Sequence, residues 1–164
     1  MAGNIFWKER SIVTLQDRTN TTAMATGSGA AAVTADLDVR TSGNAAGDNY
    51  GVFELVVRWG TITNIIAGVI AAELYLVPLI DGTNLPDVDL TAGTSYVSPN
   101  AGAGNFIVTK AAVSATDLRI HSGPVFLLPA LHRAYIINRS GQTMTTTSGT
   151  SWQLRVVTAQ WQYT

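Results

Sequence analysis

The stretch of sequence that decides the fold is Glu73-Leu74-Tyr75-Leu76-Val77-Pro78-Leu79-Ile80-Asp81-Gly82-Thr83-Asn84. An apolar run leads directly into a tight polar turn, and Asp-Gly is a strong turn signal because both residues tolerate positive φ. Similar cycles of apolar strand and polar turn recur along the rest of the chain. This pattern predicts an all-β protein.

The cleanest alternation of apolar and polar residues runs from Val52 to Trp59. One face of this predicted strand carries Phe53, Leu55, Val57 and Trp59, and the other carries Glu54 and Arg58. Because side chains alternate across a strand, the first face is expected to be core and the second to meet water.

The same pattern predicts further strands at residues 31–39, 62–66, 69–80, 106–112, 118–121, 125–128, 133–138 and 152–163. Pro124 and Pro129 are expected at strand ends, where a missing N–H costs least. Residues 82–105 are expected to form a long loop. In the last strand the apolar residues shift from even to odd positions between Val157 and Ala159, which predicts a β-bulge there.

The length of 164 residues suits one domain with a sizeable core. Eight to ten short strands predict a two-sheet β-sandwich, with jelly roll as the favoured version and an immunoglobulin-like sandwich as the alternative. Residues 1–29 are small and polar, with extended pieces at 11–16 and 21–26, and predict an extended N-terminal arm. The jelly-roll domain is expected over residues 30–164.

Composition narrows the range of partners. Only 13% of residues are charged and the net charge is -1, so no basic patch is expected to bind nucleic acid. The most apolar stretch, residues 62–80, is interrupted by Asn64 and Glu73, which argues against a membrane-spanning helix. There is no cysteine, which excludes disulfides and thiolate metal sites. No secretory leader is expected.

Candidate catalytic and metal-binding groups favour structural roles. His121 and His132 are the only histidines and have no metal-ligand spacing. Asp81, Asp87 and Asp89 surround the predicted loop and could ligate Ca²⁺, although solvated turn carboxylates are favoured. Glu54 and Glu73 could form a glycosidase pair, but polar strand faces are favoured, with Arg58 or Arg133 as cross-strand partners. No catalytic, cofactor-binding or metal-binding residue is therefore predicted.

The four tryptophans fall into two groups. Trp59 and Trp152 follow the apolar faces of their strands and are expected in the core. Trp7 and Trp161 lie near the chain ends, where an aromatic side chain can anchor a neighbouring subunit. With Lys8 and Arg10, these two are the predicted partner-binding residues.

Several motifs in the second half of the chain resemble small structural proteins of tailed bacteriophages. The residues that carry the resemblance are Glu73 to Pro78, Asp81-Gly82-Thr83-Asn84, Leu127-Leu128-Pro129, Tyr135-Ile136-Ile137-Asn138, Ser140-Gly141 and the closing strand. The resemblance covers roughly residues 70–163. Members of this group with known roles are head decoration or cement proteins.

The resemblance implies a non-enzymatic jelly-roll homotrimer in the virion, made in the host bacterial cytoplasm and placed on the capsid exterior. Its implied partner is the major capsid protein, with no cofactor, nucleic acid or membrane. Two alternatives stay open. One is a tail or baseplate structural component, and the other is a carbohydrate-binding module that uses its aromatic residues and the loop from Gly82 to Asn105.

Overall fold

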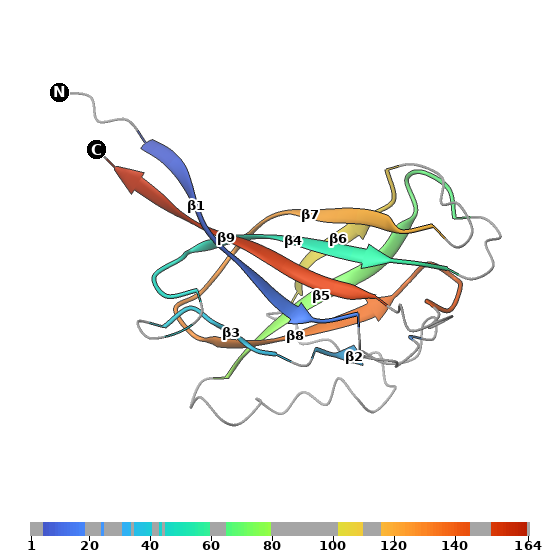
Figure 1. Ribbon diagram of the computed structural model, residues 1–164, viewed down its shortest axis with the longest axis horizontal. Helices are drawn as coiled ribbons and strands as arrows, with labels where there is room; N and C mark the ends of the chain where they lie inside the picture. The colour runs from blue at the N-terminus through green and yellow to red at the C-terminus, as the bar shows by residue number, and fades with distance from the viewer. Residues whose placement is uncertain are drawn as a thin grey trace.

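A computed structural model describes residues 5–18, 24, 31–33, 35–40, 43, 45–59, 65–79, 102–109, 116–144 and 152–163, with the backbone alone for 5–11, 31–32, 102–103 and 161–163. These residues form an all-β fold (Figure 1). Its strands are β1 (Ile5–Gln16), β2 (Ala31–Ala32), β3 (Leu37–Asp38), β4 (Tyr50–Val57), β5 (Ile70–Leu79), β6 (Gly102–Ile107), β7 (Leu118–Phe126), β8 (Leu131–Asn138) and β9 (Gln153–Tyr163). The predicted fold class, a β-sandwich, is confirmed at this level.

The strands form two antiparallel sheets. The first has the order β1-β9-β4-β7, and the second has the order β2-β8-β5-β6, with β3 also pairing with β8. In Figure 1 the first sheet lies in front of β5 and β6. Almost every neighbouring pair joins strands that are far apart in sequence, so the fold depends on long-range pairing.

The core lies between the two sheets and follows the alternation along each strand. Phe53, Leu55, Val57 and Trp59 are all fully buried, as predicted from the sequence. Trp152 is also buried in this core, which confirms its predicted place. Burial of a large apolar side chain contributes about 1.5–3 kcal/mol relative to exposure, so these positions account for much of the stability.

The described part of the predicted N-terminal arm comprises residues 5–18 and Met24. Residues 5–16 form β1, which pairs with β9 along its whole length. Leu15 and Met24 are buried in the core, so this segment contributes apolar surface as well as backbone pairing. The boundary at residue 29 falls outside the described residues and stays a prediction.

The irregularity expected in the last strand lies instead in its partner. β9 pairs with β4 from Gln153 to Ala159 without a register shift. The shift is in β1, between Glu9 and Ser11, which face Ala159 and Thr158. The expected position of the irregularity, at Thr158 and Ala159, is therefore confirmed, but the extra residue lies in β1 and not in β9. Here the extra residue is taken up by the edge strand, which has a partner on one side only and can bend more easily.

Several predicted boundaries also differ from the structure. The two strands predicted at 118–121 and 125–128 are one strand, β7, with Pro124 inside it. Pro124 is tolerated because β7 is an edge strand, where one side of the backbone makes no ladder bond. β6 begins at Gly102, inside the predicted loop. Ile65 and Ile66, the described part of the strand predicted at 62–66, are not in a strand.

A buried polar network ties the end of β8 to the core. Asn138 donates from Nδ2 to the carbonyls of Met24, at 2.9 Å, and Gln142, at 2.7 Å. Its Oδ1 accepts bonds from the backbone N–H and the hydroxyl of Ser140, at 3.0 and 2.7 Å. The indole N–H of Trp59 donates to Ser140 Oγ at 3.3 Å. This satisfied network fixes the turn after β8.

Candidate functional site

The solvent-facing side of β1-β9-β4-β7, called here the outer face, carries a row of apolar residues. Register partners place Ile12 of β1 opposite Val157 of β9, Val157 opposite Val52 of β4, and Val52 opposite Pro124 of β7. Directly opposite residues point to the same side of a sheet, so the row crosses all four strands. Ile12 is 67% exposed, which is unusual for a large aliphatic residue in a strand.

A charged cluster forms the next row on the outer face, with Glu54 at its centre. Arg155 Nε donates to Glu54 Oε1 at 3.0 Å, and Arg155 Nη2 bonds to the same oxygen. Arg119 Nη1 donates to this oxygen at 3.1 Å, and His121 Nε2 lies 3.1 Å from Oε2. Partial burial raises the pKa of Glu54, but the bonds from Arg155 and His121 outweigh burial and hold that pKa below its ordinary value.

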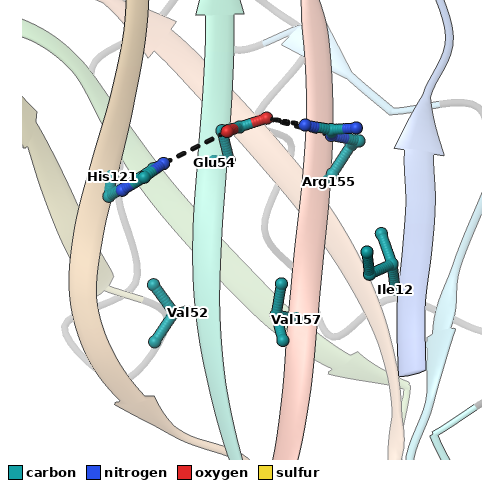
Figure 2. Close-up of a pocket in the computed structure, with 6 residues that line it drawn as sticks. All are labelled: Ile12, Val52, Glu54, His121, Arg155 and Val157. Atoms are coloured by element: carbon teal, nitrogen blue, oxygen red, sulfur yellow. Dashed lines mark hydrogen bonds and ion pairs between the residues drawn. The ribbon is translucent and has the colours of Figure 1, made fainter. Parts of the chain in front are cut away.

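The two rows together enclose a shallow hollow of about 200 Å³. Figure 2 shows Val52 and Val157 beside each other below the Glu54 ion pairs, with Ile12 across from them on β1. The hollow therefore has an aliphatic floor and a polar wall made by Glu54, His121 and Arg155. Such a site suits an apolar group that can also contact planar cationic side chains.

The ion pairs differ from those expected from the sequence. Arg58 pairs with Asp117 at 2.9 Å, and Asp117 also pairs with Arg18 at 2.7 Å. Arg133 pairs with Asp36 at 2.9 Å. The prediction that Arg58 or Arg133 pairs with Glu54 or Glu73 was therefore wrong, because the partners of these arginines come from loops whose approach no local pattern indicates.

Glu73 lies on β5, in the sheet opposite that of Glu54. It accepts a bond from Tyr75 Oη at 2.7 Å and pairs with Arg139 at 2.8 Å. Partial burial raises its pKa, but the bonds from Arg139 and Tyr75 outweigh burial and lower that pKa below its ordinary value. Each glutamate is thus an ion-paired carboxylate of its own sheet, as favoured from the sequence.

The paired ends of β1 and β9 form a second feature, called here the terminal ribbon: residues 5–8 with 160–163. The pairing of β4 with β9 ends at Ala159, whereas β1 and β9 continue to Ile5 and Tyr163. Figure 1 shows this ribbon extending away from the other strands, toward both chain ends. Within it Trp7 is the register partner of Trp161.

The predicted contact residues therefore come together in the backbone. Trp7, Lys8 and Arg10 lie on β1, with Arg10 at the register shift that begins the body of the sheet, and Trp161 lies on β9. In the sequence, Trp7 and Trp161 lie near opposite ends of the chain, and nothing there indicates that they are register partners. The long-range pairing of the first and last strands creates this relation.

The remaining predicted groups have simpler surroundings. His132 is buried, and its Nε2–H donates to the carbonyl of Leu128 at 2.9 Å, while burial lowers its pKa. Asp81, Asp87, Asp89 and the predicted loop from Gly82 fall outside the described residues, apart from Gly102 to Asn105 in β6. Within the described ranges no three His, Asp or Glu side chains gather as a metal site. The same ranges contain no helix long and apolar enough to span a membrane.

Comparison with models of known protein families, with curated proteins and with solved structures found no match to this chain. The outer face and the terminal ribbon are therefore interpreted from their own chemistry. The hollow was not predicted from the sequence, although Arg155 and Val157 alternate with buried residues along β9, and Ile12 is followed by Val13, which packs against the core. That alternation was the signal that could have placed them on a common exposed face.

Proposed function

We propose that this chain is a non-enzymatic structural protein of a phage virion, which decorates the capsid and stabilises it by binding the assembled major capsid protein. The proposal includes a jelly-roll fold and a homotrimeric state. The nested pairing supports the jelly roll, since β1 pairs with β9, β2 and β3 with β8, β4 with β7, and β5 with β6. Wrapping such nested antiparallel pairs gives two facing sheets.

The observation that carries the proposal is the terminal ribbon. It extends away from the other strands and brings Trp7 opposite Trp161, with Lys8 beside them in the sequence. A projecting two-stranded ribbon can lie in a groove of a partner or add to the edge of its sheet. Tryptophan and arginine are the residues that most often dominate binding energy at protein interfaces. The ribbon is thus the proposed capsid contact.

Decoration also agrees with the composition of the chain. With 13% charged residues, the surface repels neighbouring subunits only weakly. A ligand that binds the assembled shell and not its free subunits raises the free energy of disassembly. A trimer repeats each contact three times, so modest contacts of one subunit give strong attachment.

The test adds purified protein to capsids that lack it, followed by co-sedimentation and cryo-electron microscopy. Trp7→Ala and Trp161→Ala, singly and together, should weaken capsid binding at least tenfold and leave the melting temperature close to wild type. Leu128→Ala changes an exposed apolar residue elsewhere and serves as the matched control. Undiminished binding by the double variant would remove the ribbon from the mechanism. Deletion of the whole predicted arm is a poor test, because it removes Leu15 and Met24 from the core.

The same experiment addresses the alternatives. Wild-type protein that leaves capsids bare would favour a tail or baseplate component, or a carbohydrate-binding module. Binding to a glycan array that is lost in Trp161→Ala would then support the module. Absence of binding across a broad glycan array, together with binding to isolated tails, would support the tail component.

A further inference from the structure

An exposed aromatic side chain lies on the outer face, one row away from the apolar row. Phe126 is the last residue of β7 and is 59% exposed. It packs edge-to-face against Tyr50, with ring centroids 5.7 Å apart and an interplanar angle of 74°. Its register partner is also Tyr50, so the ring is held in a defined position by the neighbouring strand. Removal of a fixed, exposed ring of this kind from water by a partner is favourable.

The hollow lies on the same face of the same sheet. Tyr50, Val52 and Glu54 alternate along β4 and therefore share one side. The volume of about 200 Å³ is below the range of about 300–1,000 Å³ that is usual for small-molecule sites, so a single side chain is the better fit. An aromatic ring in this hollow would contact aliphatic groups below and the guanidinium of Arg155 at its side, which is a favourable combination.

We infer that two copies of the chain pair through their outer faces, with Phe126 of each copy in the hollow of the other. A projection and a hollow on one surface are what a two-fold interface requires, because each copy then supplies both halves of the contact. From the spacing of strands and residues in a sheet, Phe126 lies roughly 12 Å from the centre of the hollow. One two-fold axis midway between them satisfies both contacts at once.

The charged cluster does not oppose this pairing. With the axis in that place, the two Glu54 side chains lie roughly 15 Å apart by the same spacings. That distance exceeds the Debye length of about 8 Å at physiological ionic strength, so repulsion between the clusters is largely screened. Arg119, Arg155 and His121 already surround each Glu54, which limits the charge that a partner must desolvate.

The size of the face sets the expected strength. Four strands of about eight residues cover about 500 Å² per copy, so a pair buries about 1,000 Å² in total. This is the low end for specific interfaces, and we expect association in the micromolar range or weaker. The pairing rests on the outer face alone and does not depend on the proposed capsid role or on the trimer.

Sedimentation velocity across a range of protein concentrations tests the inference. As the protein concentration rises, the wild-type mass should reach twice the mass of Phe126→Asp. The association constant of Phe126→Asp should be at least tenfold lower than that of wild type. Ile107→Asp changes an equally large exposed residue on β6 of the other sheet and should associate like wild type. A wild-type mass that is constant over the whole range would overturn the inference. A Phe126→Asp variant that associates like wild type would also overturn it, even if that variant lost capsid binding.

Cross-linking tests the geometry without depending on affinity. Because the chain has no cysteine, single cysteines can be introduced cleanly. A mixture of Phe126→Cys and Ile12→Cys proteins treated with a short bis-maleimide should give the mixed dimer in excess over either protein alone. A mixture of Ile107→Cys with Ile12→Cys is the matched control and should stay uncross-linked. Equal yields in the two mixtures would show that the faces do not meet as inferred.

Discussion

Replacement of Asn138 by alanine should destabilise the protein more than any change at an exposed amide. Asn138 is fully buried and takes part in four hydrogen bonds, two as donor and two as acceptor. Both carbonyls that it contacts still have a donor within reach after the replacement. Met144 N–H bonds to the Met24 carbonyl, and the Ser140 hydroxyl, released from Asn138 Oδ1, can donate to the Gln142 carbonyl. The backbone N–H of Ser140 loses its acceptor, which is Asn138 Oδ1.

The expected cost follows from these contacts. Each lost internal hydrogen bond contributes about 0.5–1.5 kcal/mol net, and a buried donor left unpaired costs about 1–3 kcal/mol. Because the two carbonyls among its four partner groups remain satisfied, the sum is about 3–5 kcal/mol. In a chain of this length that corresponds to a fall of about 10 °C in the melting temperature.

Urea unfolding of Asn138→Ala, followed by circular dichroism and tryptophan fluorescence, measures this loss. Asn105→Ala is the matched control, because Asn105 is an exposed asparagine in β6, and it should change stability by about 0.5 kcal/mol or less. Ser140→Ala should fall between the two, since it removes the acceptor of the Trp59 indole N–H. A loss below about 1 kcal/mol in Asn138→Ala would refute the assigned role of the network.

Three further predictions concern backbone approach and pH. Gly51→Ala should cost about 1–3 kcal/mol in urea unfolding, because its Cβ would lie 2.8 Å from Val156 Cγ2, whereas Gly104→Ala, with 3.6 Å to its nearest neighbour, should be near neutral. The lowered pKa of Glu54 means that its stabilisation is present at neutral pH and is lost as pH falls below 4.5, so Glu54→Gln should unfold with a weaker pH dependence between pH 5 and 3 than wild type. Burial lowers the pKa of His132, so the unfolded chain binds a proton there more readily than the folded chain. The free energy of unfolding should therefore fall as pH drops below 6.5, and urea unfolding of His132→Gln should show a weaker dependence on pH in this range.

The fold class could be predicted because the alternation in β4 is local. Phe53, Leu55 and Val57 repeat every second residue, and this repeat alone assigns a strand and its buried face. The strand β7 could not be predicted as one element. Pro124 lacks a backbone N–H, so the local sequence predicts that a strand ends there. The proline is tolerated inside β7 because β7 lies at the edge of its sheet.

The beginning of β1 was hidden for a related reason. Phe6, Trp7 and Lys8 show no alternation that would separate a core face from a solvent face, and their pairing partners lie more than 150 positions away. Local propensity carries no information about such a partner. The terminal ribbon is thus a product of topology. The sequence indicates only that Trp7 and Trp161 lie near the chain ends.

Of the candidate site, only the position of Glu54 was predictable from the sequence, and its contacts were not. Glu54 was expected on the polar face of its strand, and it lies there. Its partners Arg119, His121 and Arg155 come from β7 and β9, 65 to 101 positions along the chain. Arg58 is much nearer in sequence, but it lies at the end of the strand and reaches Asp117 instead.

The ion pairs on the outer face explain how an exposed sheet can combine charge with apolar contact. The carboxylate of Glu54 is neutralised within the chain by Arg155, so a partner that covers this region does not have to supply a counter-ion. The desolvation cost of association is then smaller than for an unpaired carboxylate. The same pairs hold the polar wall of the hollow beside Val52 and Val157. A surface built in this way favours contacts that are specific in shape and modest in strength, which is what the proposed decoration of a capsid in many copies would require.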